Sequence, residues 1–177
     1  MKVLVTGSNG FIGKNLCVTL ETMEGMEVLR FDAGQSLDDL KDLCGEADFV
    51  FHLAGVNRPE SVEEFQTCNL GLTETLLSIL EEQKRLVPVM LSSSTQALLD
   101  NPYGQSKRQA EDRVLEWGRK NGVPVIAYRF PNVFGKWCRP NYNSVVATWC
   151  HAIARGEEIR IDDPNKTLNL VYIDHVV

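Results

Sequence analysis

A tyrosine and a lysine four positions apart are the residues of this sequence that most directly suggest chemistry. Tyr103 and Lys107 lie in a segment of helical character, and their spacing places both side chains on one face of a helix. A phenol is a poor acid or base near neutral pH unless a neighbouring cation, here the Lys107 ammonium, shifts its pKa. The pair predicts proton transfer during hydride chemistry at a carbonyl. The alternative is an ordinary exposed helical pair.

A short run of hydroxyl residues precedes this pair. Residues 92–94 are serines at the end of an apolar run, and Thr95 follows them. A hydroxyl at a strand end can bind the same substrate oxygen as the phenol. The residues alone leave Ser93, Ser94 and Thr95 open as its source.

A glycine-rich turn near the N-terminus forms a second constellation. Its glycines have G-x-x-G-x-x-G spacing between a short apolar run and a helical segment. Glycine permits a tight turn and a close backbone approach to a diphosphate, whose charge then lies at the helix N-terminus. A tight turn without a ligand is the alternative, but this position favours a dinucleotide. The residues expected to contact the cofactor are Gly7, Asn9, Gly10, Phe11, Ile12 and Gly13.

Two charged residues lie at the end of the next apolar run, where the adenosine ribose of a dinucleotide is recognised. A carboxylate at Asp32 accepts hydrogen bonds from the ribose hydroxyls and repels a 2′-phosphate, which favours NAD. An arginine at position 30 attracts that phosphate and favours NADP. Because strand residues two apart lie on one side, Arg30 and Asp32 can both reach the ribose. The residues leave NAD(H) and NADP(H) both open.

The elements that position these residues follow from the apolar pattern. Short apolar runs alternate with segments of helical spacing, which predicts an α/β fold: a Rossmann-type doubly wound parallel sheet flanked by helices. A helix at 36–44 leaves no room for another strand before Phe49, so the layer after the second strand is expected to be trimmed. Pro102 suits the start of a helix and Gly122 its end. The expected strands contain residues 3–5, 28–31, 49–53, 87–91 and 125–128, and the other expected helices cover about 11–24, 66–84 and 103–120.

Length and composition restrict the class of protein. The 177 residues, 44% of them hydrophobic, can bury one substantial core. A net charge of -6 without a basic patch gives no expectation of a nucleic-acid partner. No apolar run approaches membrane-spanning length, and the N-terminus reaches glycine too early for a signal peptide. The five cysteines are widely spaced without a Cys-x-x-Cys pair, so we expect a reducing cytoplasm and no metal site.

Together these features resemble the extended short-chain dehydrogenases/reductases over essentially the whole chain. The resemblance implies that Ser94, Tyr103 and Lys107 are catalytic and that Asn69 stabilises the sheet near the site. It also implies that Leu53, Ala54, Gly55 and Phe130 border the cofactor. By contrast His52, which lies within an apolar run, is expected to be a satisfied core histidine. The segments that carry the resemblance are residues 6–13, 48–55, 69–73, 92–94 with 103 and 107, 129–135 and 167–174.

A polar segment after residue 131 is the expected substrate region. The resemblance places Asn132 against a substrate diphosphate, and the nearby Lys136, Arg139 and Asn143 suit the same anion. A solvated loop is the alternative. The expected organisation is a dinucleotide-binding domain at 1–135 followed by the start of a nucleotide-sugar region at 136–177, apparently truncated.

Residues 52–60, 100–104 and 134–144 resemble more narrowly the reductases of capsular-polysaccharide precursor synthesis. This implies NADPH-dependent reduction of a 4-keto-6-deoxy UDP-sugar toward UDP-N-acetyl-L-fucosamine, with a separate C-terminal cupin domain for C3 epimerisation. The expected partners are the UDP-sugar and, in a homodimer, a second copy of the chain. An epimerase with tightly held NAD is one alternative, and a dinucleotide-binding module without chemistry is another. A dehydratase is disfavoured because Thr95-Gln96-Ala97 supplies no acid pair.

Overall fold

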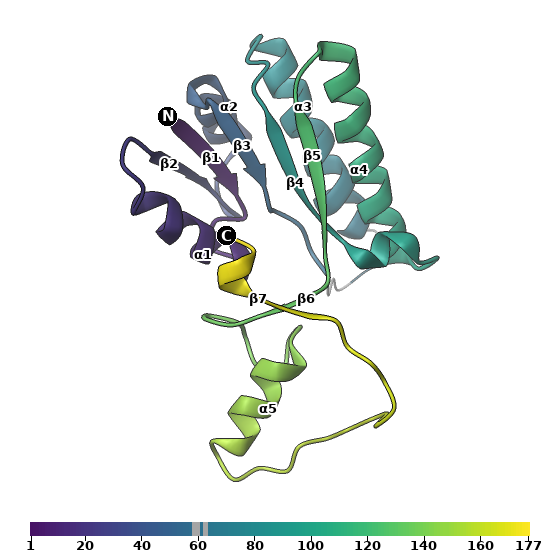
Figure 1. Cartoon of the computed structure of the whole chain (residues 1–177). Helices are drawn as coiled ribbons and strands as arrows, with labels where there is room; N and C mark the ends of the chain where they lie inside the picture. Colours follow the sequence, from purple (N-terminus) through teal and green to yellow (C-terminus); the bar gives the residue numbers. More distant parts are fainter. Residues whose placement is uncertain (58–60, 62–63) are drawn as a thin grey trace.

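The computed structural model describes residues 1–57, 61 and 64–177. A parallel sheet with strand order β2-β1-β3-β4-β5 forms its centre (Figure 1). Because β2 lies on one side of β1 and all later strands on the other, the strand order reverses at β1. Such a reversal opens a crevice at the carboxyl ends of the strands. The strands are β1 (Lys2–Thr6), β2 (Glu27–Phe31), β3 (Phe49–His52), β4 (Val89–Ser94) and β5 (Val125–Phe130).

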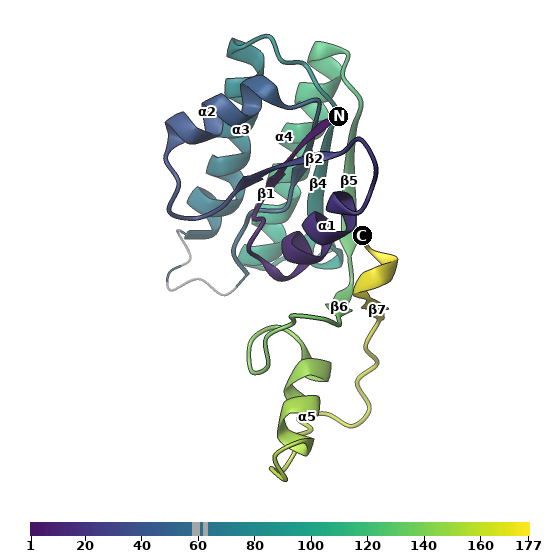
Figure 2. The same cartoon turned by 90° about the vertical axis from the view of Figure 1, so that its left-hand side faces the viewer.

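Helices cover both faces of this sheet, which confirms the predicted Rossmann-type architecture. One face carries α1 (Phe11–Glu21), and the opposite face carries the other three helices of the sheet (Figures 1 and 2). A single helix joins β2 to β3, so the layer after the second strand is trimmed as expected. The three helices of the second face are α2 (Leu37–Glu46), α3 (Leu72–Glu82) and α4 (Pro102–Asn121).

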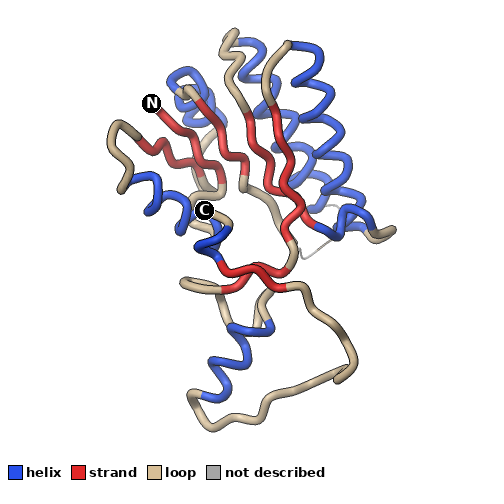
Figure 3. The backbone as a smooth tube through the Cα atoms, viewed as in Figure 1, coloured by secondary structure: helices blue, strands red, loops and turns tan. Residues whose placement is uncertain are grey.

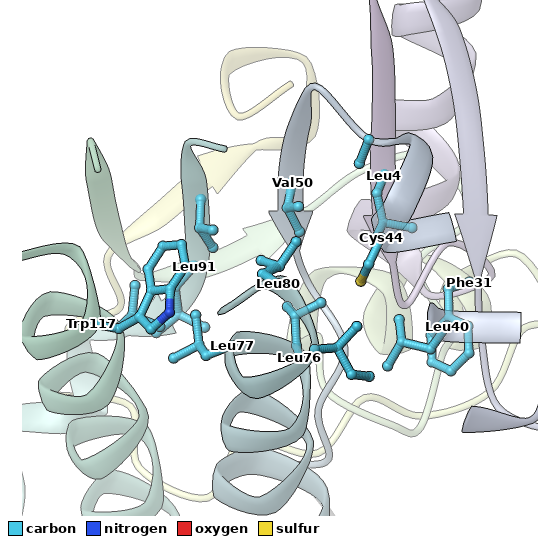
Figure 4. Close-up of a cluster of buried hydrophobic side chains, with 14 of the residues drawn as sticks. Leu4, Phe31, Leu40, Cys44, Val50, Leu76, Leu77, Leu80, Leu91 and Trp117 are labelled. Atoms are coloured by element: carbon cyan, nitrogen blue, oxygen red, sulfur yellow. The ribbon is translucent and has the colours of Figure 1, made fainter. Parts of the chain in front are cut away.

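The larger apolar core lies between the sheet and these three helices. Leu76 and Leu80 of α3 pack against strand residues such as Leu4 and Val50, and all four side chains are fully buried (Figure 4). Full burial of such a side chain stabilises the fold by roughly 1.5–3 kcal/mol. Trp117 of α4 is also buried in this cluster. A helix fixed in this way presents its N-terminal end at a defined place beside the strand ends.

The segment expected as one helix at 66–84 divides into two. A π-helix (Phe65–Gly71) precedes α3, and the Leu72 amide donates to the Thr67 carbonyl across the wider turn. Helical spacing continues on both sides of such a turn, so the apolar period does not reveal it. The buried Asn69 lies in this π-helix and turns its amide toward Val56.

The C-terminal part forms a small unit below the strand ends. Strands β6 (Asn132–Phe134) and β7 (Leu170–Tyr172) pair in parallel (Figure 3). Helix α5 (Val145–Ile153) lies between them in the sequence, and a 3₁₀ turn (Ile173–His175) follows β7. Among the described helices, none combines the length and the apolar character that crossing a membrane requires.

Candidate active site

The glycine turn packs closely against the backbone that follows β3. Gly7 has φ +71°, and a Cβ there would lie 2.7 Å from the Ala54 nitrogen. A Cβ on Gly13 would lie 2.1 Å from the Gly7 carbonyl oxygen. Between them, the Gly10 amide donates to the Gly7 carbonyl at 3.0 Å and forms the N-cap of α1. Side chains at 7 and 13 would therefore displace the turn.

The N-terminus of α1 fits an anion. The N-cap Gly10 supplies no side-chain hydrogen bond, and the first turn contains no acidic residue. The first amides of an α-helix lack intrahelical acceptors, so those of Phe11, Ile12 and Gly13 can serve a ligand. A diphosphate supplies the charge that the helix dipole favours. The geometry of the turn fits a dinucleotide.

Arg30, in β2, and Asp32, directly after it, have different partners. The Asp32 carboxylate accepts from the Asn9 amide at 2.5 Å, which ties it to the glycine turn. The Arg30 guanidinium pairs with Glu21 of α1 at 2.6 Å, and this pair raises the Arg30 pKa. Asp32 thus lies against the turn, whereas Arg30 is held along α1.

The backbone after β3 connects the turn with the catalytic helix. The Ala54 amide donates to the Thr6 hydroxyl at 3.3 Å. At Gly55 a Cβ would lie 2.6 Å from the Asn69 amide oxygen and 3.3 Å from Lys107 Nζ. Asn69 also donates to the Ser106 hydroxyl at 3.0 Å. Residues 58–60, part of the segment 52–60 that carries the narrower resemblance, lie outside the described residues.

His52 is a satisfied core histidine, as predicted. Its ring nitrogens lie 2.7 Å from the Thr6 hydroxyl and 3.0 Å from the Thr73 hydroxyl. The Thr73 hydroxyl donates to the Asn69 carbonyl, so it accepts from His52 Nε2–H. Burial, with a smaller effect of the Lys107 charge, lowers the His52 pKa to about 3. The ring is neutral and joins β1, β3 and α3.

Helix α4 begins where the sequence predicts, and its start fixes Tyr103. Pro102 occupies the first turn, and the Asn101 side chain caps the helix by accepting from the Gly104 amide at 2.8 Å. A Cβ on Gly104 would lie 2.2 Å from the Gln96 carbonyl oxygen. The first turn of α4 therefore packs directly against the segment that follows β4. The left-handed Gly122 ends the helix, as predicted.

The structure brings Ser94 to Tyr103. Burial raises the pKa of Tyr103, and a side-chain hydrogen bond with Ser94 acts in the lowering direction. The Phe65 ring lies 5.7 Å from the Tyr103 ring, centroid to centroid. The hydroxyl of Ser93 instead donates to Glu111, and Thr95 is exposed after the strand end. Of the three candidate hydroxyls, the geometry favours Ser94.

Lys107 lies one helical turn beyond Tyr103 and is buried. Its Nζ donates to the Ser92 carbonyl at 3.1 Å. Burial lowers the pKa of Lys107 to about 8, and the charge of Glu111 acts in the raising direction. A lysine in this state can hold or release a proton near neutral pH, which suits a proton-transfer site.

The four predicted substrate residues do not gather in one place. Asn132 and Asn143 line a groove of about 670 Å³ together with Trp149 and Arg160 of the C-terminal part. Lys136 instead pairs with Asp174, its Nζ 2.9 Å from the carboxylate. The exposed Arg139 is not among the residues that line the groove.

Two charged residues at the site were not predicted from the sequence. Glu111 is buried behind Lys107, and Arg129 of β5 binds it through two guanidinium nitrogens. Glu111 follows Lys107 by four residues, and the same spacing argument that found Tyr103 could have found it. Among the described residues, no three His, Cys, Asp or Glu side chains gather in a group that could hold a metal ion.

The fold and this site define the class of protein. Residues 3–177 match the NAD dependent epimerase/dehydratase family, and the chain belongs to that family. The resemblance to extended short-chain dehydrogenases/reductases is thereby confirmed.

Particular relatives are similar along the whole chain. At 51% identity over 177 residues, the chain is similar to UDP-2-acetamido-2,6-beta-L-arabino-hexul-4-ose reductase of Pseudomonas aeruginosa, covering 100% of itself and 48% of that protein. It matches the crystal structure of capsular polysaccharide assembling protein CapF from Staphylococcus aureus with a TM-score of 0.89 and 44% identity, over 99% of this chain and 48% of that one. UDP-glucuronic acid 4-epimerase from Bacillus cereus in complex with NAD shares the fold, with a TM-score of 0.87 and 21% identity over 99% and 71%. The chain spans about half the length of the first two.

Proposed function

We propose that the protein reduces the keto group of a 4-keto-6-deoxy UDP-sugar with NADPH or NADH, in the synthesis of a capsular or other surface polysaccharide. The observation that carries this proposal is the set of Ser94, Tyr103 and Lys107: Lys107 lies one turn beyond Tyr103 on α4, and the Ser94 side chain is near enough to Tyr103 to act on its pKa. The similar Pseudomonas aeruginosa protein is a reductase of a UDP-linked hexul-4-ose, which supports the substrate class. Homodimer formation and a cytoplasmic location stay predictions.

The glycine turn and its neighbours would hold the dinucleotide. The N-terminus of α1 would bind the diphosphate, and Asp32 the adenosine ribose. When bound, the nicotinamide supplies a hydride to the carbonyl carbon. The residues proposed to hold the cofactor are Gly7, Asn9, Gly10, Phe11, Ile12, Gly13, Arg30, Asp32, Leu53, Ala54, Gly55, Tyr103, Lys107 and Phe130.

Tyr103 serves as the proton donor in this proposal. Its phenol gives a proton to the carbonyl oxygen as negative charge develops there, so ketone, hydride and proton together give the alcohol. The Ser94 hydroxyl binds the same oxygen and orients it. The ammonium of Lys107 favours the resulting phenolate until solvent returns the proton.

The substrate diphosphate would bind on the C-terminal part. Asn132 and Asn143 share a groove, and the guanidinium of the exposed Arg139 can approach an anion. Lys136 reaches the diphosphate only by leaving Asp174.

Asp32 favours a second candidate, an epimerase that retains NAD. Its carboxylate lies against the glycine turn, where it repels a 2′-phosphate. An epimerase returns the hydride to its substrate and consumes no reduced cofactor. Purified protein that retains NAD and leaves added NADPH unchanged would support this candidate.

The reductase proposal is tested by incubating the complete protein with the 4-keto-6-deoxy UDP-sugar and either NADPH or NADH. We expect consumption of reduced nicotinamide in a one-to-one ratio with the alcohol product, measured by absorbance and by NMR of the sugar. A parallel titration without sugar determines which cofactor binds more tightly. No consumption of either cofactor would contradict the proposal.

A further inference from the structure

Glu111 is a buried carboxylate one helical turn beyond Lys107. Only 4% of its surface is exposed, and it lies on the face of α4 that also carries Tyr103 and Lys107. A buried charge is costly unless it is paired and hydrogen-bonded. The proposed mechanism gives Glu111 no proton to move, so its burial behind the site needs another explanation.

The carboxylate of Glu111 joins three elements. Arg129 of β5 donates through Nε at 3.0 Å to one oxygen and through Nη2 at 2.6 Å to the other. The Ser93 hydroxyl of β4 donates to the first oxygen. Burial raises the pKa of Glu111, but the hydrogen bonds from Arg129 and Ser93 oppose it, and the net pKa is lowered. Glu111 is therefore an anion that binds α4 to β4 and β5.

These contacts fix the strand end that carries the candidate hydroxyl. Ser93 lies between Ser92, whose carbonyl accepts from Lys107, and Ser94, whose side chain acts on the pKa of Tyr103. Holding Ser93 against α4 restricts both of its neighbours.

The charge of Glu111 also acts on Lys107. Other titratable groups lie around this pair: the neutral His52 on β3 is near Lys107, and Arg108 on α4 and Arg129 on β5 are near Glu111. Tyr103 lies one turn before Lys107 on α4. Arg108 and Arg129 are cations, so their charges disfavour the ammonium form of Lys107. Glu111 is the group whose negative charge raises the pKa of Lys107 against the effect of burial.

We propose that Glu111 is a positioning residue of the site, which holds the end of β4 against α4 and supplies the negative charge that favours the ammonium form of Lys107. The inference rests on the proposed function in assigning proton transfer to Tyr103 and Lys107. Arg129 keeps the carboxylate ionised and in place.

The test is the pKa of Lys107 in Glu111→Gln, a variant that keeps the shape of the side chain and removes its charge. The pKa is measured on the 177-residue chain from the ¹³Cε resonance of Lys107, identified by its absence in Lys107→Arg. We expect a fall of about half a unit or more. Asp112→Asn removes the same charge from the adjacent, exposed position and should leave this pKa unchanged. A folded Glu111→Gln chain with an unchanged pKa would overturn the proposal.

The wild-type chain gives a second measurement if Glu111→Gln does not fold. Protonation of Glu111 in acid removes the charge next to the Lys107 ammonium. The Lys107 ¹³Cε resonance should therefore show a second, acidic step. A titration with the alkaline step alone would also overturn the proposal.

Activity of the complete protein separates this inference from the proposed function. In Glu111→Gln the alkaline limb of kcat/KM for keto-sugar reduction should move to lower pH by the same shift as the Lys107 pKa. A wild-type protein without reductase activity, but with the pKa shift, would refute the function and leave the inference standing. Reductase activity in the wild-type protein, with no shift of the Lys107 pKa in Glu111→Gln, would support the function and refute the inference.

Discussion

Lys107 is buried, and burial disfavours its charged ammonium form. It is buried among the strand ends, one hydrogen bond reaches the Ser92 carbonyl, and its pKa falls from the ordinary 10.5 to about 8. Between these two pH values the unfolded chain binds more protons at this residue than the folded chain does. Stability therefore rises with pH across that window, and the full cost of burying the ammonium is present below about pH 8.

Lys107→Met should stabilise the ligand-free chain at pH 7 while removing the charge proposed to favour the Tyr103 phenolate. The depression of the pKa sets an upper limit of roughly 3 kcal/mol on the gain, since one unit corresponds to about 1.4 kcal/mol. The gain should shrink as the pH rises from about 8 toward 10.5. Thermal unfolding over this pH range measures it, with the exposed Lys120→Met as control. A variant less stable than wild type at pH 7 would contradict the account.

At the residue scale, the spacing of residues along the sequence predicted more of the site than the residue types did. The spacing of Tyr103 and Lys107 placed both on one helix face, and the structure agrees. The residues alone left the choice among adjacent hydroxyls open and only the resemblance favoured Ser94, because the sequence does not show that Ser93 contacts Glu111 while the Ser94 side chain acts on Tyr103. The contribution of Glu111 depends on a partner eighteen residues away, Arg129, which periodicity within one helix does not reveal.

The glycine turn is the element whose shape depends most on the absence of side chains. A Cβ on Gly13 would lie 2.1 Å from the backbone oxygen of Gly7, a contact that no rotamer change relieves. Gly45 near the end of α2 offers a contrast, since its nearest contact would be the flexible Gln83 side chain at 3.5 Å.

Gly13→Ala and Gly45→Ala should therefore act in opposite directions. We expect Gly13→Ala to cost about 2 kcal/mol or more of stability and to abolish dinucleotide binding, because the turn must shift. Gly45→Ala should gain about 0.5–1 kcal/mol through helix propensity and leave binding unchanged. Chemical denaturation and cofactor calorimetry measure both effects. Full dinucleotide affinity in Gly13→Ala would show that the turn does not contact the cofactor.

At the element scale, the strands and helices around the site were predictable because amphipathic alternation and terminal signals such as Pro102 and Gly122 are local. The π-helix was not, since it leaves the apolar period on either side intact. Its effect is tertiary: it turns Asn69 toward Val56 and Ser106.

Over the whole molecule, helices cover one face of the sheet only in part, the face that carries α1. Helix α1 packs over Val3 and Val5, whereas Ile126 and Tyr128, on the same face at the other edge of the sheet, are 43% and 49% exposed. Neighbouring exposed apolar side chains of this size form a patch to which an apolar ligand can bind.

The 177-residue chain should consequently bind a hydrophobic fluorescent dye at this face. The double variant Ile126→Thr and Tyr128→Thr should lose most of the dye signal and change stability by about 0.5 kcal/mol or less. Met23→Thr is the matched control, because Met23 is exposed to a similar extent, 47%, after α1. Equal dye signals from the double variant and wild type would show that the patch lies elsewhere.

Tyr103→Phe tests the central claim most directly, because it removes one oxygen from the proposed proton donor. In the complete protein, with a 4-keto-6-deoxy UDP-sugar and the preferred reduced cofactor, we predict that turnover falls by about 100-fold or more. The dissociation constant of the cofactor, measured by calorimetry on the same sample, should stay at the wild-type value. Turnover within a few-fold of wild type would contradict the assignment of Tyr103 as the proton donor.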